Sequence, residues 1–119
     1  MKLTIMGELP DLNKYINAER SNKYGAAAMK KKATELVAYS CWEQKIPRGL
    51  GTVRLDCVWY CKNKRKDRDN VKFARKFVQD GLVLAKVITN DGWDDVLDGI
   101  DRCEIDKDEP RVEIEITEV

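Results

Sequence analysis

Two aspartates, separated by one residue and preceded by a run of cations, are the feature of this chain best suited to chemistry. Residues 62–70 read Lys-Asn-Lys-Arg-Lys-Asp-Arg-Asp-Asn, which places Asp67 and Asp69 directly behind Lys66. Cations attract a polyanion, whereas carboxylates repel it unless a metal ion lies between them. A phosphate-bearing substrate brought to a divalent cation would satisfy both groups. The segment therefore suggests, as a hypothesis, metal-dependent chemistry of the nuclease kind.

The spacing of the two aspartates would let them share one metal ion. In an extended or turning segment, the side chains of residues i and i+2 point the same way, so both carboxylates can converge. Mg²⁺ prefers one or two carboxylates, with waters and a substrate phosphate completing its octahedron. The alternative is that Asp67 and Asp69 only neutralise neighbouring cations and cap a helix. Spacing alone leaves both interpretations open.

Lysines and a third carboxylate extend the candidate site. Lys72 and Lys76 follow Asp69 at i+3 and i+7, on the same face of an expected helix. A lysine facing a metal-bound phosphate would stabilise the charge that builds up in hydrolysis. The simpler interpretation is a solvated stripe in which Lys76 pairs with Asp80. Asp91 lies in a later turn and would join the site only if the fold brings it back, with Asp94 and Asp95 as rivals.

The composition excludes several kinds of enzyme. The 119 residues include 22 Lys and Arg against 21 Asp and Glu, so attraction to DNA must come from local charge. The chain contains no histidine, which removes Ser-His, Cys-His and His-metal mechanisms. The four cysteines lack CxxC spacing and fit reduced thiols of a cytosolic protein better than a zinc site. No apolar run is long enough for a membrane span, and no secretory h-region is present.

Hydrophobic periodicity predicts one domain over residues 1–119, of class α/β or α+β, in which helices pack on a mixed sheet. We expect the order β-α-β-α-β-β, with residues 11–24 as a loop or irregular lead-in. Strands are expected at 2–6, 52–60, 100–106 and 112–119, and helices at 26–44 and 69–86.

These residues resemble a known family, the RusA family of Holliday junction resolvases. The resemblance rests on Lys66-Asp67-Arg68-Asp69-Asn70, a following helix with Lys76, then Asp80-Gly81-Leu82 and Val87-Ile88-Thr89-Asn90-Asp91. The opening strand with Pro10 and Asn13-Lys14-Tyr15, and the closing strand from Arg111 to Ile116, are also similar. The likeness runs through nearly the whole chain and is closest to phage- and prophage-borne members.

The resemblance implies a small homodimeric endonuclease that nicks four-way DNA junctions with Mg²⁺, or with Mn²⁺ in its place, in the cytoplasm of a bacterial host. Asp67, Asp69 and Asp91 would be the catalytic, metal-binding carboxylates. The catalytic lysine would be Lys76 if an insertion precedes it, which the downstream spacing favours, or otherwise Lys72. Asn90 departs from the family, where an aspartate often stands. We expect the DNA-contacting residues to be Lys62, Lys64, Arg65, Lys66, Arg68, Lys72, Asn13 and Lys14.

Two other classes of function fit the same residues. A protein that binds branched DNA without cleaving it would use the cations of residues 62–68 and need no metal. A plain dimeric scaffold would leave its charges solvated and show no salt-sensitive affinity for DNA.

Overall fold

The strand β2 (Val53–Cys61) is the element around which the computed structural model of residues 1–119 is arranged; the description leaves out the side chain of Lys23. Alternate residues of β2 are fully buried, and those between them are partly or fully exposed. This alternation places one face of the strand against the core. The strand expected at 52–60 is confirmed.

Four further strands complete a mixed sheet. They are β1 (Lys2–Met6), β3 (Val96–Leu97), β4 (Asp101–Ile105) and β5 (Arg111–Glu118). β5 lies between β1 and β2 and is antiparallel to both, while β3 and β4 pair in parallel with the other edge of β2. The predicted strands at both ends of the chain are confirmed, and the two-residue β3 is an addition that the sequence did not suggest.

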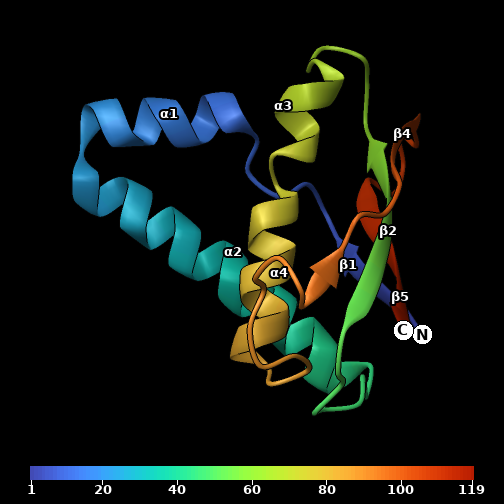
Figure 1. Ribbon diagram of the computed structural model, residues 1–119. Coiled ribbons are helices and arrows are strands. Elements are labelled where there is room, and N and C mark those ends of the chain that lie inside the picture. The colour runs from blue at the N-terminus through green and yellow to red at the C-terminus, as the bar shows by residue number, and fades with distance from the viewer.

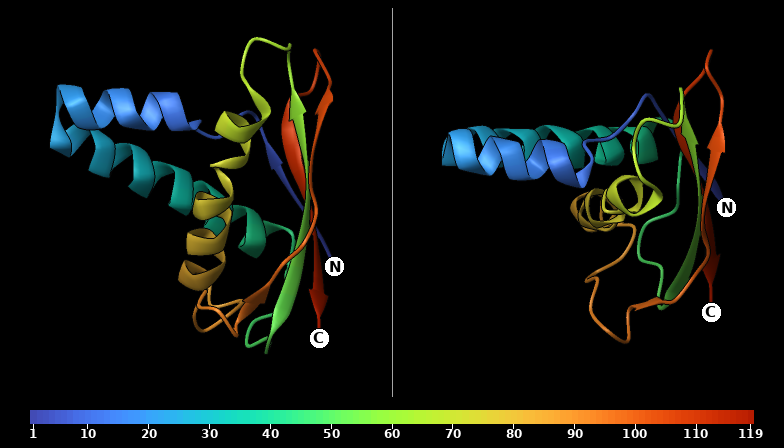
Figure 2. Two further views of the ribbon diagram at one scale, coloured as in Figure 1. Left: turned by 45° about the horizontal axis from the view of Figure 1, so that its top comes forward. Right: turned by 90° about the horizontal axis from the view of Figure 1, so that it is seen from above.

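The helices lie on one side of this sheet, as Figures 1 and 2 show. They are α1 (Leu12–Ser21), α2 (Lys23–Glu43), α3 (Arg68–Lys72) and α4 (Arg75–Leu84). α2 packs against α4, α1 and β1, whereas the end of α1 and the start of α2 extend away from the sheet. The core between helices and sheet is apolar, and its largest fully buried side chains include Phe77, Leu3, Ile5, Leu55, Leu82, Ile88, Ile114 and Ile116. The predicted class, helices packed on a mixed sheet, is therefore correct.

The segment expected to be irregular, residues 11–24, is helical instead. Asp11 caps α1, because its side chain accepts a hydrogen bond from the Lys14 amide at 2.8 Å. Asn22 ends α1 and caps α2 in the same way, accepting from the Tyr24 amide at 2.8 Å. α1 has no fully buried residue, and most of its residues are polar, so the segment resembles a polar loop in sequence. Its apolar side chains are only half-buried; they are Leu12, Tyr15, Ile16 and Ala18.

The single helix expected over residues 69–86 is two helices, α3 and α4. At the junction the amides of Ala74, Lys76 and Phe77 bond to carbonyls three residues back, at 3.1, 3.1 and 2.9 Å, instead of four. These tighter bonds interrupt the α-helical pattern. The aromatic rings of Tyr15, Phe73 and Phe77 pack together there, with centroids 5.6 to 6.2 Å apart. The interruption separates the aspartate-bearing turn from the buried helix behind it.

None of the helices among the described residues combines the length and the apolar character needed to cross a lipid bilayer.

The close approach of α2 and α4 depends on Gly81. A Cβ atom at this position would collide with the side chain of Val37 on α2 and lie 3.1 Å from the Thr34 carbonyl oxygen. Because Val37 is fully buried, it has no free space into which to move. Gly81 therefore sets the distance between α2 and α4.

We expect Gly81→Ala to lower the free energy of unfolding by about 1–3 kcal/mol, because the added methyl group overpacks this contact. Gly25→Ala is the matched control, since its Cβ would meet only Asn22 Cβ at an ordinary 3.8 Å. That control should be neutral or stabilise α2 by up to about 1 kcal/mol. Urea denaturation of both variants measures the difference. Equal stability of the two variants would contradict the assigned role of Gly81.

Candidate functional site

A groove of about 770 Å³ lies where the end of β2, the short helix α3 and the end of β4 meet. This region is at the top of Figure 1. The floor is partly apolar, with Val71, Cys61, Cys103 and Ile105, and charged side chains surround it. The charged and polar lining residues are Asn63, Lys64, Lys66, Asp67, Arg68, Asp69, Lys72 and Glu104.

Asp67 and Asp69 both line this groove. Asp67 is the N-cap of α3 and has an extended backbone, with no hydrogen bond from its side chain to the helix. Asp69 accepts a bond from the neighbouring Asn70 amide at 3.0 Å. Both aspartates are exposed, and neither takes part in an ion pair among the described residues. Their carboxylates are thus available to a cation from solution.

The structure separates the two candidate lysines. Lys72 lines the groove together with the aspartates. Lys76 lies outside it, with its ammonium nitrogen 3.9 Å from Asp80 Oδ2, and Lys30 of α2 approaches the same oxygen at 3.9 Å. The simpler interpretation of Lys76, pairing with Asp80, is therefore what the structure shows.

Asp91 does not lie with Asp67 and Asp69 in one copy of the chain. It follows α4, whereas the two aspartates precede it, and the 10 residues of α4 alone span about 15 Å. Figure 1 shows the two segments at opposite ends of α4. Asp91 is absent from the groove lining, and no group of three or more Asp, Glu or Cys residues able to hold a metal occurs among the described residues.

The basic residues fall into two groups by their contacts. Lys62, Lys64 and Arg65 are exposed, and among the described interactions none of the three side chains has an ion-pair partner. Arg68 is exposed too, and its guanidinium reaches the Cys103 carbonyl oxygen at 3.4 Å. Asn13 and Lys14 are exposed in the first turn of α1, outside the groove lining.

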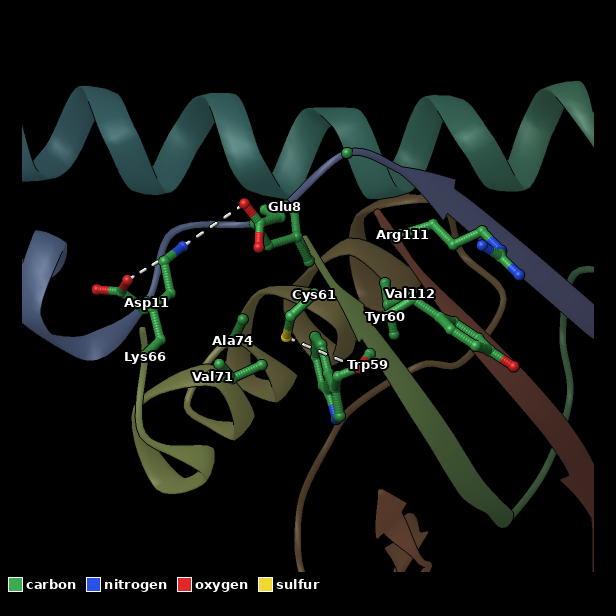
Figure 3. Close-up of a pocket in the computed structure, with 12 residues that line it drawn as sticks. Glu8, Asp11, Trp59, Tyr60, Cys61, Lys66, Val71, Ala74, Arg111 and Val112 are labelled. Carbon is green, nitrogen blue, oxygen red and sulfur yellow. Dashed lines mark hydrogen bonds and ion pairs between the residues drawn. The ribbon is translucent and has the colours of Figure 1, made fainter. Parts of the chain in front are cut away.

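Lys66 differs from the other cations because it is held by carboxylates of the protein. Its ammonium nitrogen lies 3.3 Å from Asp11 Oδ2 and 3.9 Å from Glu8 Oε1, as Figure 3 shows. Asp11 is the buried N-cap of α1, so Lys66 joins the segment before α3 to the start of α1. It contributes positive charge to one wall of the groove, but its main contacts are structural.

The thiols in the groove are not activated. Burial raises the pKa of Cys61 and of Cys103, and this effect outweighs the nearby cations Lys66, Arg68 and Lys72, which lower it. Both thiols are therefore protonated at neutral pH, unlike the thiolate that a cysteine nucleophile requires. Carboxylates and lysines remain as the reactive groups of the groove.

A polar network behind the groove was not predicted from the sequence. Arg75, at the start of α4, contacts both carboxylate oxygens of Asp101 at 3.1 and 3.2 Å and donates to the Leu55 carbonyl at 2.9 Å. The indole N–H of Trp59 donates to Asp101 Oδ1 at 3.0 Å. The pair is mostly buried, with side-chain exposures of 17% and 21%. No local pattern could reveal it, because its members come from three distant segments.

No family model matches the chain, and no curated protein matches it either.

The contribution of the Arg75–Asp101 pair to the stability of the fold around the groove can be tested by mutation. We expect Arg75→Met to lower the free energy of unfolding by about 3 kcal/mol, because Asp101 and the Leu55 carbonyl lose their shared partner. Arg48→Met is the control, since Arg48 is exposed and makes none of the described ion pairs. Thermal and urea denaturation report the change. A loss no larger than that of the control would show that the network is not needed for the fold.

Proposed function

We propose that this protein is a metal-dependent endonuclease that nicks branched DNA, with the groove between α3 and β4 as its active site. The observation that supports this most is the pair Asp67 and Asp69, which are exposed in one groove beside Lys72 and Arg68 and take no part in the ion pairs of the described residues. Such carboxylates would be unfavourable near DNA phosphates unless a cation joined them. The resemblance of the sequence to the RusA family supports the same activity.

The donor set fits Mg²⁺, and Mn²⁺ as its substitute. Asp67 and Asp69 would supply two carboxylates, and the open groove leaves room for waters and a phosphate oxygen. The bound metal would activate water and stabilise the leaving oxygen. Lys72 would place its positive charge beside the scissile phosphate, where negative charge accumulates during hydrolysis.

The exposed cations would hold the DNA backbone. Lys62, Lys64 and Arg65 lie on the segment that leads from β2 into α3, next to the groove. Contacts from such residues to phosphates position a nucleic acid without reading its sequence. Lys66 would act indirectly, by fixing α1 and its exposed residues Asn13 and Lys14 near the groove.

The remaining carboxylate, Asp91, would have to come from a second copy of the chain. Within one copy α4 separates it from Asp67 and Asp69. A two-fold dimer would bring the end of one α4 to the groove of its partner in both directions at once. Two such grooves would suit a four-way junction, whose symmetry is close to two-fold. We also propose the site of action given by the resemblance, the cytoplasm of a bacterial host infected by, or carrying, the phage.

Nicking of a synthetic four-way junction in Mg²⁺ tests the proposed activity. We expect Asp69→Asn to cut at least about a hundredfold more slowly than wild type, because the metal loses a charged ligand. Glu43→Gln, which neutralises an exposed carboxylate at the end of α2 outside the groove, should cut like wild type. If Asp69→Asn is as fast as the control, the groove is not the active site.

The two lysines can be ranked in the same assay. Because Lys72 lines the groove and Lys76 pairs with Asp80, we expect Lys72→Ala to slow nicking by roughly tenfold to a hundredfold and Lys76→Ala to have a smaller effect. Junction affinity, measured separately, should change little in both. The opposite ranking would return the catalytic role to Lys76, which the spacing of the resemblance favours.

A protein that binds branched DNA without cleaving it is the second candidate. It is favoured by the finding that the described residues of one copy contain no group of three or more acidic or cysteine side chains placed to hold a metal, while several cations line the groove. Salt-sensitive junction binding with no nicking in Mg²⁺ or Mn²⁺ would support this function over the first.

A further inference from the structure

The two edge strands of the sheet, β1 and β4, differ in whether side chains hydrogen-bond to their outward-facing backbone groups. At the β1 edge, the side-chain amide of Gln44 covers Thr4: it accepts from the Thr4 amide at 2.9 Å and donates to the Thr4 carbonyl at 2.6 Å. Such a cap prevents another strand from pairing there. At the other edge, the one side-chain bond to an outward-facing backbone group of β4 among the described residues is a single bond of 3.4 Å from Arg68 to the Cys103 carbonyl, which leaves the outward amides of β4 uncovered.

The hydrogen bonds of β4 show which of its groups face outward. The Ile100 carbonyl accepts from Cys57, and the Asp106 amide donates to Cys61, so the even-numbered residues bond to β2. In a parallel ladder the backbone N–H and C=O groups of the alternate residues point away from the paired strand. The backbone groups of Asp101, Cys103 and Ile105 therefore point away from β2, toward the open edge of the sheet. Arg68 reaches the Cys103 carbonyl at 3.4 Å, and a carbonyl can accept a second bond.

Exposed apolar side chains and a charged pair lie on and beside β4, at the open edge of the sheet. Leu97, Ile100 and Ile105 are 39%, 60% and 49% exposed, an unusual set for an edge strand. Arg102 and Glu104 lie on the sheet face that the helices leave open, paired with each other at 3.1 Å. Both are exposed, by 61% and 48%.

We infer that β4 is the docking surface for a second copy of this chain, in an antiparallel pairing centred on Cys103. This register places Cys103 opposite Cys103 of the partner subunit and Asp101 opposite Ile105 of the partner subunit, so that the outward-facing groups bond to one another. Arg102 then lies opposite Glu104 of the partner subunit, and Glu104 opposite Arg102 of the partner subunit. The strand is thus complementary to itself in charge.

This pairing is closed and two-fold, because each copy presents the same strand. It joins the two sheets into one and places both grooves beside the symmetry axis, since Cys103, Glu104 and Ile105 line the groove. The antiparallel direction brings the segment preceding β4 of the partner subunit, which follows its own Asp91, toward this groove. That last consequence rests on the proposed function, whereas the interface itself does not.

Charge reversal tests the register. We expect Arg102→Glu and Glu104→Arg each to weaken self-association by roughly tenfold, because two attractive cross-strand pairs become repulsive. The double variant should recover affinity to within about threefold of wild type, because it restores opposite charges in both pairs. Lys31→Glu is the control, since it reverses an exposed charge of an α2 ion pair away from β4. Sedimentation equilibrium measures association, and thermal unfolding checks that every variant is folded.

A monomeric wild type at the highest concentration studied, or a folded double variant that stays as weak as the single variants, would overturn the pairing. The readout is assembly and not cleavage, so it can fail while the nuclease proposal stands.

A thiol cross-link gives an independent measurement. Cys103 is the only cysteine of the four that is not buried, and the register puts it at the two-fold axis. A short bis-maleimide should therefore link two wild-type copies and fail to link Cys103→Ser. Dimers that sediment as such but form no Cys103-dependent link would place the interface elsewhere.

Discussion

A single guanidinium, that of Arg75, joins three parts of the fold that the chain order keeps apart. It binds Asp101 of β4 and the Leu55 carbonyl of β2 from the first turn of α4. Because α3 leads directly into α4, this contact also sets where α3 stands relative to β4. The groove between α3 and β4 exists as a consequence, and the side chains of Asp67 and Asp69 are presented in it. Removing one partner of such a mostly buried pair leaves the other charge without compensation, which is why the pair constrains the fold.

The basic side chains differ in whether carboxylates of the protein already pair with them. Arg75 and Lys66 are occupied by carboxylates of the protein and hold elements together. Lys62, Lys64, Arg65 and Lys72 have no such partners among the described ion pairs and remain available to a polyanion. A net charge of +1 therefore conceals a local excess of positive charge around the groove.

Sequence patterns predicted what depends on local periodicity. The alternation in β2 and β5 and the apolar spacing of α2 predicted the positions of these elements. The spacing of Asp67 and Asp69 allowed two interpretations, and the structure places both residues in the lining of one groove. The helix α1 was missed, because its sequence is mostly polar and none of its residues is fully buried. The Arg75–Asp101 pair and the position of Asp91 depend on tertiary structure, which spacing along the chain does not report.

Binding of Mn²⁺, followed by the paramagnetic broadening of backbone amide signals, tests the central claim most directly. In a titration of the isotope-labelled protein with substoichiometric Mn²⁺, the signals of Asp67, Asp69 and Lys72 should broaden first, and that of Glu43, at the end of α2, should stay unaffected. Early broadening of the Asp91 signal in the same titration would place this carboxylate near the ion, delivered by a second copy. Broadening that begins elsewhere, or that persists unchanged in the Asp67→Asn, Asp69→Asn double variant, would contradict a metal site in the groove.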